Sequence, residues 1–283
     1  MLFRSRKGAI LMKIAAFYEN IADASAATGI QVEDVIRRLM ERGLSAVYVG
    51  GATLRDMGCQ VEKIIKETGI SVEGVHDWVD LAHDPDSELL QDTVDWAAKL
   101  EAKNILFVPG LLGETDDVDV YNSNIKKAMK RAVDYARQYD LPVSMENLDR
   151  LDCTYCSFEG LKAFLDGVPE MKCSLDTGNF MLVHDDELHA LFEVSDRLCT
   201  IHLKDRSRKQ LYDDIPAAYC NDGVPVYVTP VGYGDIKMRE ILDYLKEQNY
   251  SGNVIAELYG YSQEKMLEGL EQSIDWLKKE LSQ

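Results

Sequence analysis

Three carboxylates and one imidazole occupy matching positions in the second half of the chain, each at or near the end of a short apolar segment. They are Glu146 in SMENLD, Asp176 in SLDTGN, His202 in IHLKD and Glu257 in IAELYG. A buried segment does not ordinarily finish on an ionised group. If the four segments are neighbouring strands of one sheet, the four side chains meet at one rim.

Such a group of charges would repel one another and carry shifted pKa values unless a cation lay among them. Taken singly, the aspartate also fits a helix cap, the histidine a hydrogen-bonded core residue and each glutamate a salt bridge at the rim. All four on consecutive strands favour one divalent metal ion. Oxygen-rich ligands with a single histidine suit Mn²⁺, our first choice, as well as Mg²⁺ or Co²⁺, and Zn²⁺ is also compatible.

The elements that must position these residues follow an alternating pattern along the chain. Short β-rich segments, mostly apolar without strict alternation, predict eight parallel strands over residues 13–18, 45–50, 72–79, 104–110, 142–147, 172–177, 198–205 and 253–260. Apolar residues three and four apart predict helices between them, over residues 32–43, 88–102, 125–140, 238–249 and 264–281.

Eight such units of about 35 residues each predict a single closed (β/α)8 TIM barrel, an α/β fold whose sites lie at the carboxyl ends of the strands. An open doubly wound sheet is the alternative. It requires a glycine-rich loop after the first strand, and FYENIADAS contains no glycine. We expect the barrel to span residues 12–283 and treat residues 1–11 as an N-terminal extension.

Composition restricts the partners. The chain has 31 basic and 49 acidic residues, a net charge of -18, which disfavours nucleic acid and anionic membranes. No apolar run approaches the roughly 20 residues that span a bilayer, so we expect a cytoplasmic protein with a small-molecule partner.

The six cysteines of the chain should stay reduced, and the CxxC at residues 153–156 is interpreted as loop thiols. A homo-oligomer, dimer or tetramer, is left open.

The motifs SMENLD, SLDTGN, IHLKD and GYGDI, followed by VIAELYG, resemble the sugar isomerase and epimerase family with xylose isomerase-like TIM barrels. The family also includes inosose dehydratases and AP endonucleases, and the resemblance runs from about residue 12 to the end. It implies that Glu146, Asp176, His202 and Glu257 bind one divalent metal. It also implies that the two glutamates move protons.

Two departures from the family pattern narrow the function. Relatives often have a histidine three residues after the strand-six aspartate, where this chain has Asn179. Asn179 is therefore a candidate substrate contact, although the usual histidine contact is not carried over unchanged. AP endonucleases use histidines after strands two and four to complete a trinuclear zinc cluster, and VYVGGA and FVPGLLG have none. DNA cleavage is therefore not expected.

Further residues are candidates for supporting roles. His76 could hydrogen-bond a substrate hydroxyl, and Trp78 or Tyr18 could pack on a sugar face, although core packing explains either aromatic equally well. Lys204 could polarise a substrate oxygen, with a salt bridge as the plain alternative. Asp205 and Asn147 are candidates for orienting metal ligands from behind. Three histidines receive no role: His83, His184 and His189.

Two late segments bear on access to the site. Residues 206–230 are long for a βα connection and could cover the site or contact a partner subunit. The spacing of the two glycines in VGYGDIKMREIL (residues 231–242) fits neither the P-loop nor the dinucleotide-binding pattern, so we interpret the motif as a turn into a helix.

We therefore expect a metal-dependent sugar isomerase or epimerase that removes a proton next to a carbonyl, with the metal stabilising the enediolate. A polyol-ketone dehydratase, which is a lyase using the same site, is the first alternative. A non-catalytic sugar-binding barrel is the second, and it need not retain a stoichiometric metal.

Overall fold

Parallel strands form a closed barrel within residues 12–282, the part of the chain that the computed structural model describes. Around the barrel the order is β1, β11, β7, β6, β5, β4, β3, β2, with bounds β1 (Lys13–Phe17), β2 (Leu44–Gly50), β3 (Ser71–Trp78), β4 (Asn104–Val108), β5 (Val143–Met145), β6 (Lys172–Asp176), β7 (Leu198–Leu203) and β11 (Asn253–Ala256). β1 pairs in parallel with both β2 and β11, which closes the barrel. The predicted fold is confirmed, and each predicted strand segment overlaps one barrel strand.

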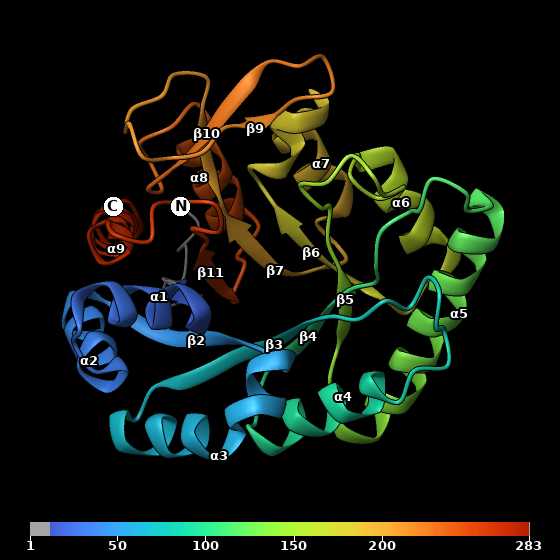
Figure 1. Cartoon of the computed structure of the whole chain (residues 1–283), viewed down its shortest axis with the longest axis horizontal. Helices are drawn as coiled ribbons and strands as arrows, with labels where there is room; N and C mark the ends of the chain where they lie inside the picture. The colour runs from blue at the N-terminus through green and yellow to red at the C-terminus, as the bar shows by residue number, and fades with distance from the viewer. Residues whose placement is uncertain (1–11, 283) are drawn as a thin grey trace, which may run out of the picture.

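Helices surround the strands (Figure 1). They are α1 (Tyr18–Thr28), α2 (Val32–Arg42), α3 (Gly51–Thr68), α4 (Leu89–Lys99), α5 (Val118–Ala136), α6 (Phe158–Gly167), α7 (Glu187–Val194), α8 (Met238–Glu247) and α9 (Met266–Leu281), with short 3-10 turns η1 (Arg137–Tyr139) and η2 (Asn179–Val183). The five predicted helices are present. Four of them differ from the prediction by at most three residues at either end, whereas α5 begins seven residues before the predicted start at residue 125. None of the helices in the described range is long and apolar enough to cross a lipid bilayer.

The last helix secures the first part of the barrel. α9 packs against α1 and α2, and these three helices lie side by side at one edge of Figure 1. Arg42, in the last turn of α2, bonds Glu271 at 3.1 Å and Asp275 at 2.5 Å, both from α9. The two ends of the barrel domain are therefore joined through their helices as well as through the β1–β11 pairing.

Two separate apolar cores explain why the strands lack strict alternation. The larger core lies between the strands and the helices, and β1 contributes Ile14 and Ala16 to it. The smaller core fills the barrel and includes Ala15 and Phe17, the intervening residues of the same strand. Because successive side chains point to opposite faces and both faces are covered, nearly every strand position is apolar.

The segment after β7 differs from the prediction. β7 ends at Leu203, and Asp205 begins a small antiparallel sheet of order β8 (Asp205–Ser207), β10 (Pro225–Thr229) and β9 (Ala218–Tyr219). The chain leaves the barrel here because the Asp205 carboxylate accepts backbone N–H groups from Gly232 and Gly234, each at 2.9 Å. Residues 231–242 do turn into α8, as predicted, and these two glycine amides are already occupied.

Two smaller expectations concern the N-terminus and the cysteines. The proposed extension, residues 1–11, lies outside the described residues. Cys153 and Cys156 lie in the loop between β5 and α6, and all six cysteines of the chain are unpaired, as expected for loop and core thiols.

Gly74 in β3 provides a test of the packing inside the barrel. A Cβ at this position would lie 2.0 Å from Cε2 of Tyr48 and 2.7 Å from Oδ1 of Asn104, two side chains that are themselves hydrogen-bonded at 2.5 Å. We predict that Gly74→Ala lowers the free energy of unfolding by about 1–3 kcal/mol, because the interior cannot relax freely. Urea denaturation measures this change. Ser71→Ala, at the exposed start of the same strand, should change it little, and equal midpoints for the two variants would contradict the prediction.

Candidate metal centre

The four residues singled out in the sequence converge at the carboxyl ends of four neighbouring strands. Glu146 follows β5, Asp176 ends β6, His202 lies in β7 and Glu257 follows β11. One ligand atom from each lies within 4.8 Å of those from the other three. His202 Nδ1 is 3.0 Å from Glu146 Oε2 and 3.2 Å from Glu257 Oε2. The barrel therefore brings together residues that are far apart in the sequence, and their binding of a metal stays a prediction.

These side chains are buried, yet several of their polar atoms have no hydrogen-bond partner. The unpaired atoms are Glu146 Oε2, Asp176 Oδ2 and both ring nitrogens of His202, whose close contacts lack hydrogen-bond geometry. A buried polar atom left unpaired costs about 1–3 kcal/mol. Because these atoms face one another and are carboxylate oxygens with an imidazole nitrogen, the residues fit a hard or borderline divalent cation.

Burial and mutual repulsion shift the pKa values of the group. Burial, together with the charge of Glu257, raises the pKa of Asp176 well above its usual value. Burial also raises the pKa of Glu146. Burial opposes a charge on His202, but the carboxylates of Glu146 and Glu257 outweigh it and raise the pKa of its imidazole to about 10. Holding these carboxylates together in their ionised form is therefore unfavourable, and a bound cation would offset that cost.

Glu257 differs from the other two carboxylates because a lysine contacts it. Lys204 is 2% exposed, and its Nζ lies 3.0 Å from Glu257 Oε1 and 2.8 Å from Asp149 Oδ2. Burial alone would raise the pKa of Glu257, but Lys204 and His202 reverse the effect and hold that pKa below its usual value. Lys204 therefore forms the salt bridge that the sequence left as an alternative, while its side chain also lines the cavity described below.

Backbone amides and one side-chain amide hold Asp176 in place. Its Oδ1 accepts the N–H groups of Gly178 at 2.8 Å and Asn179 at 2.9 Å, which leaves Oδ2 directed to the group. The Asn147 side chain donates to the Asp176 carbonyl at 2.9 Å and accepts from its N–H at 3.0 Å. Asn147 thus fixes the position of Asp176, and its support of a metal ligand stays a prediction. The Asp205 carboxylate instead accepts N–H groups of the backbone that precedes α8.

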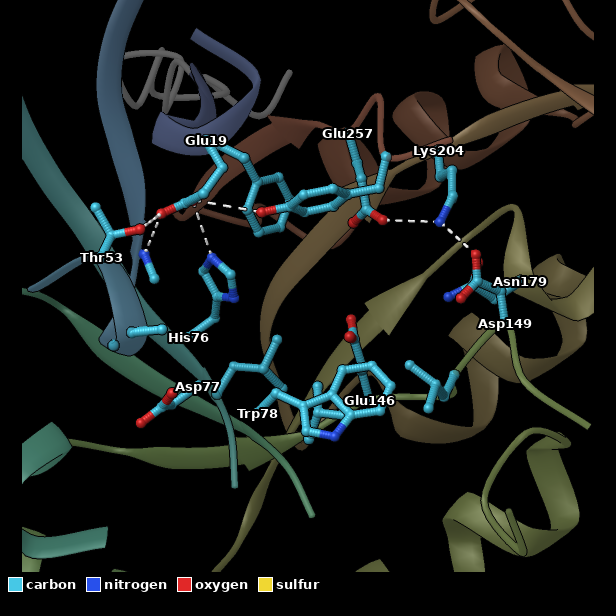
Figure 2. A pocket seen from close by; sticks show the side chains of 18 residues that line it. Glu19, Thr53, His76, Asp77, Trp78, Glu146, Asp149, Asn179, Lys204 and Glu257 are labelled. Carbon is cyan, nitrogen blue, oxygen red and sulfur yellow. Dashed lines mark hydrogen bonds and ion pairs between the residues drawn. The ribbon is translucent and has the colours of Figure 1, made fainter. Parts of the chain in front are cut away.

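A cavity of about 420 Å³ opens over the group and is lined by both glutamates. Figure 2 shows the Glu146 and Glu257 side chains entering it from opposite sides and pointing toward each other.

The other predicted residues of the site lie partly in this cavity. Its lining includes His76, Trp78, Asn179 and Lys204, and Trp78 is 50% exposed. Tyr18 does not line it, because its side chain packs into the core between strands and helices. No residue of the loop 206–230 is among the lining residues, so within the described chain that loop does not cover the cavity.

Glu19 is a lining residue that the sequence reasoning missed. Its Oε1 accepts the Gly50 N–H at 2.9 Å and the Thr53 hydroxyl at 2.7 Å, and its Oε2 lies 3.2 Å from Nε2 of His76. These groups form the wall opposite Lys204 in Figure 2. A signal was present, because Glu19 is an acidic residue two positions beyond the end of an apolar strand, like the residues that were found.

Comparison with known proteins agrees with this architecture. Residues 23–280 match the model of the family described as xylose isomerase-like TIM barrel. The chain belongs to this family. Comparison with curated protein sequences finds no significant match.

Solved structures of the same fold include enzymes and a metal complex. D-allulose 3-epimerase from Methylomonas sp. has a TM-score of 0.73 at 15% identity, over 99% of this chain and 100% of that one. The IOLI protein with a bound zinc atom has a TM-score of 0.73 at 15% identity, over 96% and 98%. The probable 3-DHS dehydratase AsbF from Bacillus anthracis has a TM-score of 0.69 at 14% identity, over 94% and 99%. At these identities the likeness shows the fold alone.

Asp176→Asn separates the cost of the buried charges from their use in metal binding. The amide keeps an oxygen for the N–H groups of Gly178 and Asn179 but removes one negative charge from the group. In metal-free protein we expect the variant to be at least as stable as wild type. Added Mn²⁺ should stabilise wild type by about 2.7 kcal/mol at 100 times its Kd and the variant far less. Thermal denaturation with and without Mn²⁺ measures both effects.

Asp196→Asn is the matched control, because Asp196 is exposed and remote from the centre. It should respond to Mn²⁺ as wild type does. Equal stabilisation of Asp176→Asn and wild type by Mn²⁺ would show that Asp176 is not a ligand.

Proposed function

We propose that the protein is a divalent-metal-dependent isomerase or epimerase of a sugar or sugar derivative that moves a proton on the carbon next to a carbonyl. One observation carries this proposal. Two glutamates face each other across the cavity, both lie close to His202, and only Glu257 also contacts a buried lysine, Lys204. Two carboxyl groups of one type thus have different proton affinities at one site, as acid and base roles require.

Glu257 is the residue we assign to proton removal. Lys204 keeps its carboxylate ionised, so it can accept a proton from a substrate carbon. The electron pair released from the C–H bond moves toward the carbonyl oxygen. Glu146, whose pKa is raised by burial, is the matching group for returning a proton. Return to the opposite face of the same carbon gives an epimer, and return to the neighbouring carbon gives the aldose or ketose isomer.

Glu146, Asp176, His202 and Glu257 would hold the divalent cation. When bound, the cation would polarise the substrate carbonyl and stabilise the negative charge that develops on its oxygen. We favour Mn²⁺, for the ligand reasons given above, with Mg²⁺, Co²⁺ or Zn²⁺ as substitutes.

The cavity walls support a polyhydroxylated substrate with one less polar face. Glu19 and His76 on one wall, and Lys204 and Asn179 on the other, provide partners for hydroxyl groups. Apolar surface in the same cavity comes from Phe17, Leu106, Val108, Leu148 and Trp78. Cavities of this size and composition are typical of small-molecule sites. The proposed setting is the cytoplasm, where the six free cysteines stay reduced.

A dehydratase acting on a polyol ketone is the second candidate. It begins with the same proton removal, and one protein of similar structure is described as a probable dehydratase. Loss of water then requires a proton for the leaving hydroxyl, and His76 and Lys204 both face the cavity.

The proposal is tested by incubating the Mn²⁺-loaded protein in D₂O with a panel of ketoses, inososes and their phosphates. Deuterium uptake at the carbon next to the carbonyl reports proton removal, whatever the product. Isomers or epimers leave the substrate composition unchanged, whereas dehydration removes one water. Stoichiometric metal without deuterium uptake from any member of the panel would favour a sugar-binding barrel instead.

Glu257→Gln should lower the rate of deuterium uptake by a factor of about 10²–10⁴, the usual contribution of a general base. Metal content must be measured beside the rate, because Glu257 is also a proposed ligand. Glu247→Gln, on the exposed surface of α8, should retain the wild-type rate. Wild-type exchange by folded Glu257→Gln would refute the assigned role.

Lys204→Met should change the pH dependence of the reaction. Without the ammonium group at 3.0 Å, the pKa of Glu257 rises toward the value that burial alone would give. The ionised form is then lost at higher pH, so the acidic limb of kcat/KM moves upward. Asp149→Asn removes the other partner of Lys204 and keeps the contact with Glu257, so it should not move the limb upward. An unchanged acidic limb in Lys204→Met would show that the lysine does not control Glu257.

A further inference from the structure

A second group of metal-binding side chains lies outside the cavity. His184, Cys220 and Asp222 each offer one ligand atom, and these atoms lie within 4.8 Å of one another. His184 Nε2 is 3.1 Å from Asp222 Oδ2. Cys220 is 3% exposed, whereas the side chains of His184 and Asp222 are 39% and 50% exposed. The group is therefore buried on its sulfur side and open to solvent on the other.

The three side chains come from two segments that the fold holds against each other. His184 follows η2, and Cys220 and Asp222 belong to the tight turn between β9 and β10. The Asn221 N–H donates to the Leu182 carbonyl at 2.8 Å, and the Cys220 thiol donates to the Met181 carbonyl at 3.3 Å. Figure 1 shows the inserted sheet beside the segment that leads into α7. The backbone thus sets the distance between the segments before any ion binds.

The turn that carries two of the ligands is itself well formed. The Cys220 N–H bonds the Val224 carbonyl at 2.9 Å, and the Gly223 N–H bonds the Cys220 carbonyl at 2.8 Å. Asp222 Oδ1 accepts the Val224 N–H at 3.1 Å, which leaves Oδ2 toward His184. Little reorganisation is required, because donor atoms around a tetrahedral ion are about 3.5 Å apart at ordinary Zn–S, Zn–N and Zn–O distances.

We propose that His184, Cys220 and Asp222 form a second metal site that takes Zn²⁺, with water as the fourth ligand and the Cys220 thiol proton released to solvent on binding. One thiolate, one imidazole and one carboxylate are typical zinc donors, and the sulfur selects against Mg²⁺ and Mn²⁺. The donor set differs from that of the first centre, which contains no sulfur. The two sites therefore favour different ions.

The position of this site indicates what a bound ion does. It would fasten the inserted sheet to η2, whose first residue, Asn179, lines the cavity and, together with Gly178, donates an N–H group to Asp176. None of the three residues lines the cavity or belongs to the first centre. The role of the bound ion is to stabilise the connection from which one wall of the cavity is built.

Cobalt(II) tests the proposal, because a thiolate bound to Co²⁺ gives an intense near-ultraviolet charge-transfer band that the sulfur-free first centre cannot produce. Titrating the metal-free full-length protein with Co²⁺ should load two equivalents per chain, one of them with this band. Added Zn²⁺ should abolish the band. Cys220→Ser should lose the band and one equivalent and keep the other. The double variant His184→Asn/Asp222→Asn, which changes exposed side chains, should weaken that equivalent at least tenfold and keep the fold.

Matched thiol variants make the result specific. Cys59→Ser removes an exposed cysteine on α3 and should leave the band unchanged. A band that is absent from wild type, or that persists in both Cys220→Ser and the double variant, would overturn the proposal. A band lost in Cys156→Ser but retained in Cys220→Ser would place the metal at the CxxC loop and would also overturn it.

Discussion

The burial of three carboxylates around one imidazole is the constraint on which the rest of this structure depends. Such a group is unfavourable on its own, because its carboxylate oxygens repel and four of its polar atoms, two oxygens and two ring nitrogens, have no hydrogen-bond partner. The surroundings reduce that cost without removing it. Asn147 and two backbone amides fix Asp176, and Lys204 neutralises Glu257. A bound cation would offset the remaining cost, and the barrel supplies the stiffness that keeps like charges close together.

The two glutamates show that the environment, more than the residue type, decides chemical roles. Both follow barrel strands and both are close to His202. Only Glu257 has an ammonium group beside it, and that group is held in turn by Asp149. The two carboxyl groups therefore differ in pKa, and this difference is the basis of the proposed roles, in which Glu257 accepts a proton and Glu146 returns one. A symmetric pair would have no such preference.

The sequence predicted much of the fold for a physical reason. Strands covered on both faces are short, continuous and apolar, and their ends are marked by polar residues, so the barrel and its four central residues could be located. The predictions that were wrong or incomplete also have physical causes. Tyr18 was considered for the cavity although it packs outward from the start of α1, and Glu19, one residue later, was missed although it faces inward. The expected continuation of β7 to Asp205 was wrong, because the bonds that divert the chain come from amides some 30 residues away.

Local pattern by itself determined the elements, their order, the closed barrel and the four residues at the ends of consecutive strands, because each of these depends on periodicity or on neighbours in the chain. Only the tertiary structure decided which oxygen atoms remain unpaired, which glutamate has a cation beside it, and which wall Glu19 and His76 form. It also brought His184 to Cys220 and Asp222 across the inserted sheet. These features arise from contacts between residues distant in sequence, whose geometry depends on how the whole barrel closes.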